Sequence, residues 1–132
     1  MKRISLLFVS TALTVAMSLT AFAGQWKSDN KGYWYQNNDN SYPILSWQEI
    51  DGKWYYFGSD GRAYVNQGGG FKRKVDGKDY AFDENGKMLT GFIDKTGNVI
   101  ETEDPFVGAM YYASDDGALY NNKWLNYGYI SD

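Results

Sequence analysis

The side chains in this sequence that could carry chemistry are mainly aromatic rings. The chain of 132 residues holds five tryptophans, 12 tyrosines and seven phenylalanines, and it has no histidine and no cysteine. Electron-rich ring faces can attract cations, at about 0.5–2 kcal/mol per contact. Leucine, isoleucine and valine are sparse, so tyrosine and tryptophan must also build the core.

The carboxylates offer a second kind of chemistry, but their positions favour a structural role. Asp83 begins the segment DENG, which resembles a calcium loop only superficially, because Ala81 stands where a ligand is required and no glutamate closes the loop. We expect no metal site and no cofactor. The other aspartates nearly all occupy turn positions, where this residue is favoured locally; they are Asp51, Asp60, Asp76, Asp115 and Asp116.

Catalysis is disfavoured by the same inventory. Without histidine, without cysteine and without a serine in a nucleophile-elbow context, the chain lacks the usual general bases and nucleophiles. A glycosidase built on two carboxylates needs a cleft, which a thin repeat structure does not readily offer. We expect a protein that is not an enzyme.

The rings recur in a repeat that must position them. Residues 46–61 read SWQEIDGKWYYFGSDG, and residues 75–86 repeat this in the weaker form VDGKDYAFDENG. The turn glycines Gly61 and Gly86 lie 25 residues apart, and Gly117 follows after 31, with the excess around residues 100–105. Self-similarity at such a period is typical of stacked repeats. The units are about 24–45, 46–70, 71–91 and 92–122, with a partial unit at 123–132 that is either a cap or the start of a truncated repeat.

Each unit is predicted to be a β-hairpin. Asp-Gly, Asn-Gly and Asp-Asn pairs tolerate the positive φ of tight turns, and Asn40 replaces the turn glycine in the first unit. Side chains alternate along residues 54–57, so Tyr55 and Phe57 share a face that persists in later units and is the expected core. Trp54 and Tyr56 share the other face. Single hairpins are marginally stable, so we expect them to stack on one another, with almost no helix after the first residues.

The first 23 residues read as a secretory signal. Lys2 and Arg3 precede an apolar stretch, and Ala21-Phe22-Ala23 forms a small-x-small cleavage site before Gly24. Cleavage is favoured over a retained anchor and leaves a domain of residues 24–132. The remaining chain keeps 11 basic and 16 acidic residues, a net charge near −5, so binding to nucleic acid or to anionic lipid is disfavoured.

The pattern W-x-x-x-D-G-K-W-Y-Y-F-x-x-D-G in residues 47–61 resembles the cell-wall-binding (choline-binding) repeat of secreted proteins from Gram-positive bacteria. The resemblance implies an all-β fold, a left-handed β-solenoid of stacked hairpins that follows a helical signal peptide. It also implies that aromatic side chains hold choline between successive hairpins, and that the protein is secreted and associated with the cell wall. The implied partner is choline-bearing teichoic acid or another wall glycan, bound through many weak sites.

The resemblance and the repeat together select the candidate cage residues, although these rings could equally serve only to pack hairpin on hairpin. Asp79 in the third unit and Met110 in the fourth stand where the family has an aromatic residue, so at most one or two sites are expected. Related repeats bind glucans, so glycan binding is an alternative function, and a structural remnant of a larger modular surface enzyme is another. The candidates are Trp34, Trp47, Trp54, Tyr56 and Phe71.

Overall fold

The computed structural model describes residues 24–68, 70–101, 110–120, 123–125 and 128–130. These residues form strands and turns without a helix, and hence without an apolar helix long enough to cross a membrane. The all-β prediction is confirmed. The predicted signal peptide, residues 1–23, lies outside the described residues.

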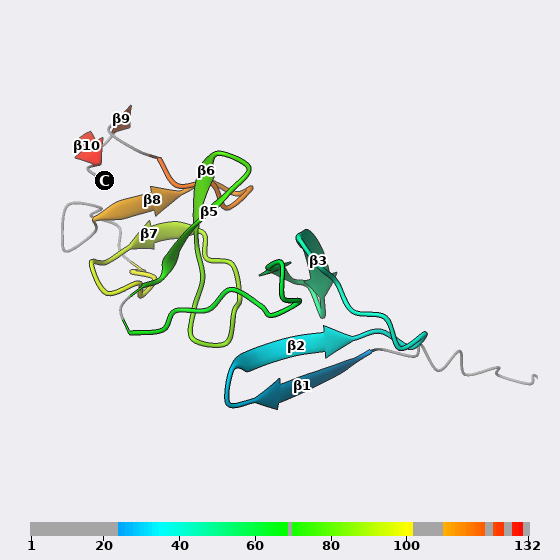
Figure 1. Ribbon diagram of the computed structural model, residues 1–132. Coiled ribbons are helices and arrows are strands. Elements are labelled where there is room, and N and C mark those ends of the chain that lie inside the picture. The colour runs from blue at the N-terminus through cyan, green and yellow to red at the C-terminus, as the bar shows by residue number, and fades with distance from the viewer. Residues whose placement is uncertain (1–23, 69, 102–109, 121–122, 126–127, 131–132) are drawn as a thin grey trace, which may run out of the picture.

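The strands pair into successive antiparallel hairpins, which follow one another in chain order from β1 to the C terminus (Figure 1). Within the described ranges each sheet has two strands, so every hairpin must gain its stability from contacts with its neighbours. Hairpin 1 is β1 (Gln25–Asp29) with β2 (Gly32–Gln36), hairpin 2 is β3 (Ser46–Ile50) with β4 (Lys53–Phe57), hairpin 3 is β5 (Lys72–Val75) with β6 (Lys78–Ala81), hairpin 4 is β7 (Gly91–Ile93) with β8 (Tyr111–Ala113), and hairpin 5 is β9 (Lys123–Leu125) with β10 (Gly128–Ile130).

Asp-Gly pairs close hairpins 2 and 3, as the sequence predicts. Asp51 and Gly52 have φ of 51° and 75°, and Asp76 and Gly77 have φ of 48° and 82°. Two successive residues with positive φ define the type I′ turn, whose twist matches that of the flanking strands. The local sequence therefore fixes the register of both hairpins, Ile50 opposite Lys53 and Val75 opposite Lys78.

A second turn follows the outgoing strand of hairpins 1 to 4. After β4, the Gly58 N–H donates to the Arg62 carbonyl at 2.9 Å and the Gly61 N–H donates to the Gly58 carbonyl at 3.0 Å. The same two bonds recur around Asp83 and Gly86 and around Ser114 and Gly117. In hairpin 1 the residue at the glycine position is Asn40, whose φ is 66°, which confirms its predicted role.

The segment after this second turn, which we call the tail, connects each hairpin to the one before it. The N–H groups of Ala63, Met88 and Leu119 each donate at 2.8 Å to a carbonyl of the preceding hairpin. The acceptors are the carbonyls of Tyr33, Trp54 and Asp79, respectively. These bonds establish that Tyr33, Trp54 and Asp79 occupy equivalent positions in hairpins 1, 2 and 3.

Aromatic contacts repeat with the same period. The Trp26 ring lies 4.8 Å from Tyr55 and 5.9 Å from Phe57, and the Trp47 ring lies 4.7 Å from Tyr80 and 5.8 Å from Phe82. In both cases a tryptophan of one hairpin packs on two rings of the next. We call these contact regions seams, so that hairpins 1 and 2 meet at the first seam, hairpins 2 and 3 at the second, and hairpins 3 and 4 at the third.

The core follows from this arrangement. Phe57 and Phe82 are fully buried and Tyr55 is 8% exposed, which confirms the predicted core face. Tyr56, expected on a freer face, is only 7% exposed. The difference arises because both faces of a central hairpin are covered, one by the hairpin before it and one by the hairpin after it.

Hairpin 4 departs from the others in the connection between its strands. Residues 94–110 replace the two-residue turn, so the extra length lies inside the hairpin, in the interval where the sequence places its excess. The connection begins with a turn in which Asp94 accepts hydrogen bonds from the N–H groups of Thr96 and Asn98, and Ile93 bridges Val99. Residues 102–109 lie outside the described residues.

Candidate functional site

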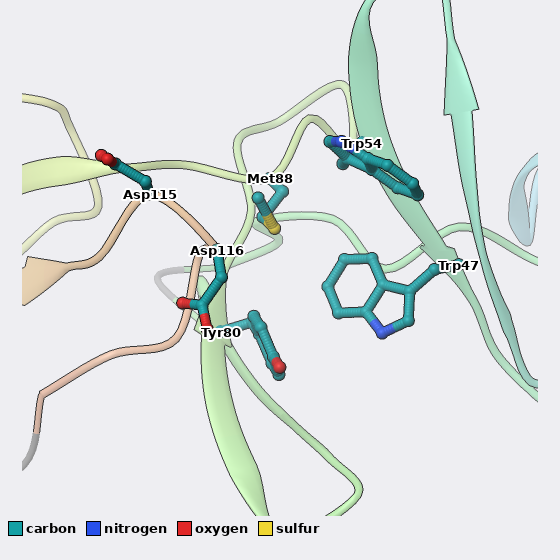
Figure 2. Close-up of a pocket in the computed structure, with 6 residues that line it drawn as sticks. All are labelled: Trp47, Trp54, Tyr80, Met88, Asp115 and Asp116. Carbon is teal, nitrogen blue, oxygen red and sulfur yellow. The ribbon is translucent and has the colours of Figure 1, made fainter.

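An open groove of about 450 Å³ lies at the second seam. Figure 2 shows two tryptophans of hairpin 2 on one side of this groove and residues of the following hairpins on the other. Three successive hairpins thus contribute to one site, and the lining is mainly apolar with carboxylates at one margin. The lining residues are Trp47, Trp54, Tyr80, Met88, Asp115 and Asp116.

The two tryptophans come from opposite strands of hairpin 2. Trp47 on β3 is paired with Tyr56 on β4, and their ring centroids lie 5.2 Å apart. This edge-to-face contact across the hairpin holds the Trp47 ring in place. Trp54 lies near the start of β4, opposite Glu49, and is 42% exposed. An exposed indole of this size beside a groove is available to a ligand, whereas a ring that serves only the core is not.

Hairpin 3 and its tail supply the opposing wall. The Tyr80 ring meets the Trp47 ring edge to face, at 4.7 Å and 65°. Met88 is held by the bond from its N–H to the Trp54 carbonyl and by its bridge to Phe82. Its flexible, polarizable thioether can adjust to the shape of a ligand, and it contacts aromatic rings favourably.

The carboxylates come from the second turn of hairpin 4. The Ser114 hydroxyl and the Ala118 N–H, the latter at 3.1 Å, donate to Asp116 Oδ1, and these bonds lower the pKa of the Asp116 carboxyl. Asp116 therefore stays ionised at neutral pH. In Figure 2 the Asp115 carboxylate points away from the rings. Ring faces, a thioether and negative charge together suit a large, weakly hydrated cation.

The sequence candidates divide between this groove and other places. Trp47 and Trp54 line the groove together. Tyr56 is buried behind Trp47, and Phe71, 4% exposed, packs on Tyr111 at 5.4 Å. Trp34 lies outside this groove, at a smaller hollow beyond the first seam.

The smaller hollow, about 370 Å³, has a different character from the groove. Its lining includes Trp34, Tyr42 and Asp60. The Arg62 guanidinium lies 5.5 Å from the centroid of the Trp34 ring and pairs with the Asp29 carboxylate at 2.5 Å. The ring face of Trp34 thus already has a cation from the chain itself.

Sequence reasoning missed four lining residues of the groove, and for Tyr80 a signal existed. Tyr80 belongs to the face predicted as core, and in hairpins 2 and 3 the prediction left the rings of that face out of the candidate site. Since the Trp47 face of one hairpin meets the Tyr80 face of the next, a site at a seam must draw on both. Met88 and the two aspartates lie in tails and turns, where the repeat pattern carries no ring to mark them.

The first seam carries a variant of the same arrangement. Trp26 and Tyr33, 38% and 44% exposed, stand at the positions of Trp47 and Trp54, and Tyr55 stands at that of Tyr80. Ala63 stands at the position of Met88, so the tail contributes a smaller side chain to the first seam. Across the described ranges there is no group of three or more histidine, cysteine or acidic residues that could hold a metal ion.

Comparison with known proteins confirms the resemblance inferred from the sequence. Residues 46–63, which comprise hairpin 2 and the start of its tail, match the family described as "Putative cell wall binding repeat". The lysozymes of Streptococcus phages Cp-1 and Cp-9 are 47% identical over 30 residues, which is 23% of this chain and 9% of each lysozyme. The chain therefore spans only a small part of the curated relatives that it matches.

Similar folds occur in solved structures. The pneumococcal cell wall endolysin from phage Cp-1 complexed with choline is 35% identical with a TM-score of 0.56, over 76% of this chain and 25% of the endolysin. The choline binding domain of Spr1274 in Streptococcus pneumoniae is 25% identical with a TM-score of 0.53, over 73% of this chain and 93% of that domain. A truncated alternansucrase from Leuconostoc mesenteroides is 29% identical with a TM-score of 0.59, over 77% of this chain and 9% of the enzyme.

Proposed function

We propose that this chain, which carries a cell-wall-binding repeat of the choline-binding type, is a non-catalytic module that retains its protein on a choline-bearing surface polymer. One observation carries the proposal: Trp47, Trp54, Tyr80 and Met88 converge on one groove. The similarity to an endolysin complexed with choline supports the same ligand.

The chemistry of the groove fits a quaternary ammonium group. Such a group is bound by ring faces, and three contacts of about 0.5–2 kcal/mol each give a weak to moderate site. The ionised Asp116 at the margin adds a favourable charge without the need for a hydrogen-bond donor on the ligand. Because one such site binds weakly, retention on a surface depends on engaging the first and second seams together on a polymer that presents many ligands.

The arrangement of hairpins on a larger scale belongs to this proposal. The seams repeat the same ring distances from hairpins 1 and 2 to hairpins 2 and 3, which supports a continuous β-solenoid over units 24–45, 46–70, 71–91 and 92–122. With a cleavable signal at residues 1–23, the module is secreted and acts at the cell wall.

Glycan binding is a second candidate with its own support. An alternansucrase in complex with isomaltotriose is 29% identical over 78% of this chain and 9% of the enzyme. Exposed rings such as Trp54 stack on sugar faces as readily as they attract cations. The negative charge of the groove margin favours the cation, since a neutral sugar gains nothing from it at long range.

Titration of the intact chain decides between these ligands. Trp54→Ala removes the most exposed ring of the groove, and Tyr42→Ala serves as a control, because Tyr42 is an exposed ring that lines a different hollow. We expect choline to quench or shift the tryptophan fluorescence of the wild type and of Tyr42→Ala, with a loss of affinity of about tenfold or more in Trp54→Ala. Isomaltotriose should give no response.

The outcomes separate the functions cleanly. A response to isomaltotriose that Trp54→Ala abolishes, with none to choline, establishes the glycan function instead. If the folded chain shows no fluorescence response to either ligand, the repeats have a structural role instead.

A further inference from the structure

We propose that the third seam is occupied by the chain's own lysine, so that it is closed to an external cation, and that Lys72 and Asp79 are the residues that set this specificity. The inference rests on the proposed function, because it states which seams of this chain accept the quaternary ammonium group.

Strand register places these residues at the positions of the two groove tryptophans. Trp47 pairs with Tyr56 across hairpin 2, and Lys72 pairs with Ala81 across hairpin 3. Tyr56 and Ala81 are equivalent, because Tyr56 lies four residues before Asp60 and Ala81 lies four residues before Asn85, at the same point of the second turn. The tail bonds to the carbonyls of Trp54 and Asp79 fix the second equivalence. Lys72 therefore holds the place of Trp47, and Asp79 holds the place of Trp54.

The opposing wall of the third seam keeps its own equivalents. Tyr111 lies three positions before Ser114, as Tyr80 lies three positions before Asp83 in the matching turn, and Leu119 makes the same tail bond as Met88. The third seam thus has the wall of a cage, with Tyr111 and Leu119. Phe71 packs edge to face on Tyr111, but the seam has neither of the two tryptophans.

The lysine ammonium lies over the Tyr111 ring, while Phe71 meets the same ring edge to face at 5.4 Å. Lys72 Nζ lies 4.5 Å from the centroid of the Tyr111 ring. On the other side of the hairpin, Asp79 lies 3.7 Å from Lys74 Nζ. An ammonium over a ring face is the contact that an external quaternary ammonium would make, so Lys72 acts as an intramolecular ligand.

The same replacement occurs at the beginning of the described chain. Trp34 is the equivalent of Tyr80 in hairpin 1, since it follows Tyr33 as Tyr80 follows Asp79. No hairpin precedes it among the described residues, and the Arg62 guanidinium lies over its ring at 5.5 Å. At both places where no tryptophan of a preceding hairpin packs on the ring, a cation of the chain lies over it. An external cation must compete with a side chain tethered in place, whose effective concentration is in the millimolar range or above.

A gain-of-site experiment tests the inference. The double variant Lys72→Trp, Asp79→Trp removes the tethered ammonium and places two indoles at the register positions of Trp47 and Trp54, beside Phe71, Tyr111 and Leu119. Isothermal titration of the full chain with choline chloride should show one further equivalent bound relative to the wild type. Adding Trp54→Ala to the double variant should return the stoichiometry to the wild-type value. A double variant with a native-like near-ultraviolet spectrum and no additional equivalent overturns the inference.

A measurement on the unmodified chain removes the dependence on folding of the variant. The ε-methylene protons of Lys72 should show an upfield ring-current shift in the nuclear magnetic resonance spectrum, which Tyr111→Leu abolishes. Saturating choline should move the indole signals of Trp47 and Trp54 and leave the Lys72 shift unchanged. A Lys72 signal that returns to its random-coil position as choline binds overturns the inference, whereas unresponsive indole signals overturn the proposed function alone.

Discussion

Asp116 performs two tasks with one carboxylate. Its Oδ1 atom accepts the bonds from Ser114 and Ala118 that close the second turn of hairpin 4, and the charge lies at the margin of the groove. The bonds that lower its pKa also hold the carboxylate in place. A turn that is needed for folding therefore fixes a charge that is useful for binding.

Replacement of Asp116 by asparagine tests the charge without removing the turn. Asparagine keeps an oxygen that accepts the Ala118 N–H, so the fold should persist while the charge is lost. We expect the affinity for choline to fall by about two- to fivefold, the range typical of exposed charge interactions. Affinity for 3,3-dimethylbutanol, an uncharged analogue of similar shape, should not change. Fluorescence titration of both ligands measures the ratio.

Asp115→Asn is the matched control for this prediction. Asp115 lines the same groove, but its carboxylate points away from the rings in Figure 2, so its effect on the ratio should be smaller. Equal effects of the two variants would mean that only the net charge of the turn matters.

Individual residues show how far the sequence could predict the site. Trp47 and Trp54 could be selected because the motif marks them and because rings of that size at a seam are either core or ligand contacts. Tyr56 and Phe71 share the same motif features but are buried. The Tyr56 ring packs against Trp47, and the Phe71 ring packs against Tyr111. Burial of this kind depends on how two hairpins meet, which no single repeat encodes.

Among the elements, the turns are the most predictable part of the fold. Asp51-Gly52, Asp76-Gly77 and Asn40 carry the positive φ that their residue types allow, so hairpin positions follow from local sequence. The turn at Asp94 inside the long connection of hairpin 4 escaped prediction. It uses Asp94 and Gly97 as the repeat does, but it begins no new hairpin.

Gly117 links the turn of hairpin 4 to the groove. Its φ is 83°, and a Cβ added there would overlap the Met88 side chain. Gly117→Ala should lower the free energy of unfolding by about 1 kcal/mol or more, from backbone strain, and should also weaken choline binding through displacement of Met88. Urea unfolding and fluorescence titration measure the two effects.

Gly77→Ala provides the comparison. Gly77 has a nearly equal φ of 82°, but a Cβ there would meet nothing within 4 Å. This variant should lose stability to a similar degree from strain and keep its affinity for choline. A loss of affinity in Gly77→Ala would show that strain alone disturbs the groove.

Packing at a seam is the main source of stability for these elements. Phe82 is fully buried between hairpins 2 and 3, against Trp47 and Tyr64. Phe82→Ala should reduce the free energy of unfolding by about 3–5 kcal/mol, the cost of deleting a buried phenylalanine. Urea unfolding monitored by circular dichroism measures it, with Val99→Ala, an exposed site, as the control. A loss below about 1 kcal/mol would contradict the seam as the core.

For the molecule as a whole, the absence of histidine determines the response to pH. The chain has none, and burial raises the pKa of Tyr55 and Tyr56, so neither the core tyrosines nor any imidazole changes charge near neutrality. Choline affinity should therefore be constant between about pH 5.5 and 8.5. A binding midpoint near pH 6.5 would contradict this expectation.

At low pH the sign of the effect follows from Asp116. Its folded pKa lies below the unfolded value of about 3.9, so the stability that the ionised form gives the turn is present above about pH 4. That stability is lost as the pH falls through the lowered value. Binding and the turn should thus fail together, in acid rather than near neutrality.

The participation of three hairpins in one groove has a mechanical consequence. A ligand seated among Trp54, Tyr80 and the Asp116 turn touches hairpins 2, 3 and 4 at once, and it leaves when any of them peels away. Ligand binding to the folded form alone raises the free energy of unfolding. A chain bound to its polymer should therefore resist shear and heat better than a free chain, because binding to the polymer also stabilises the fold that binds it.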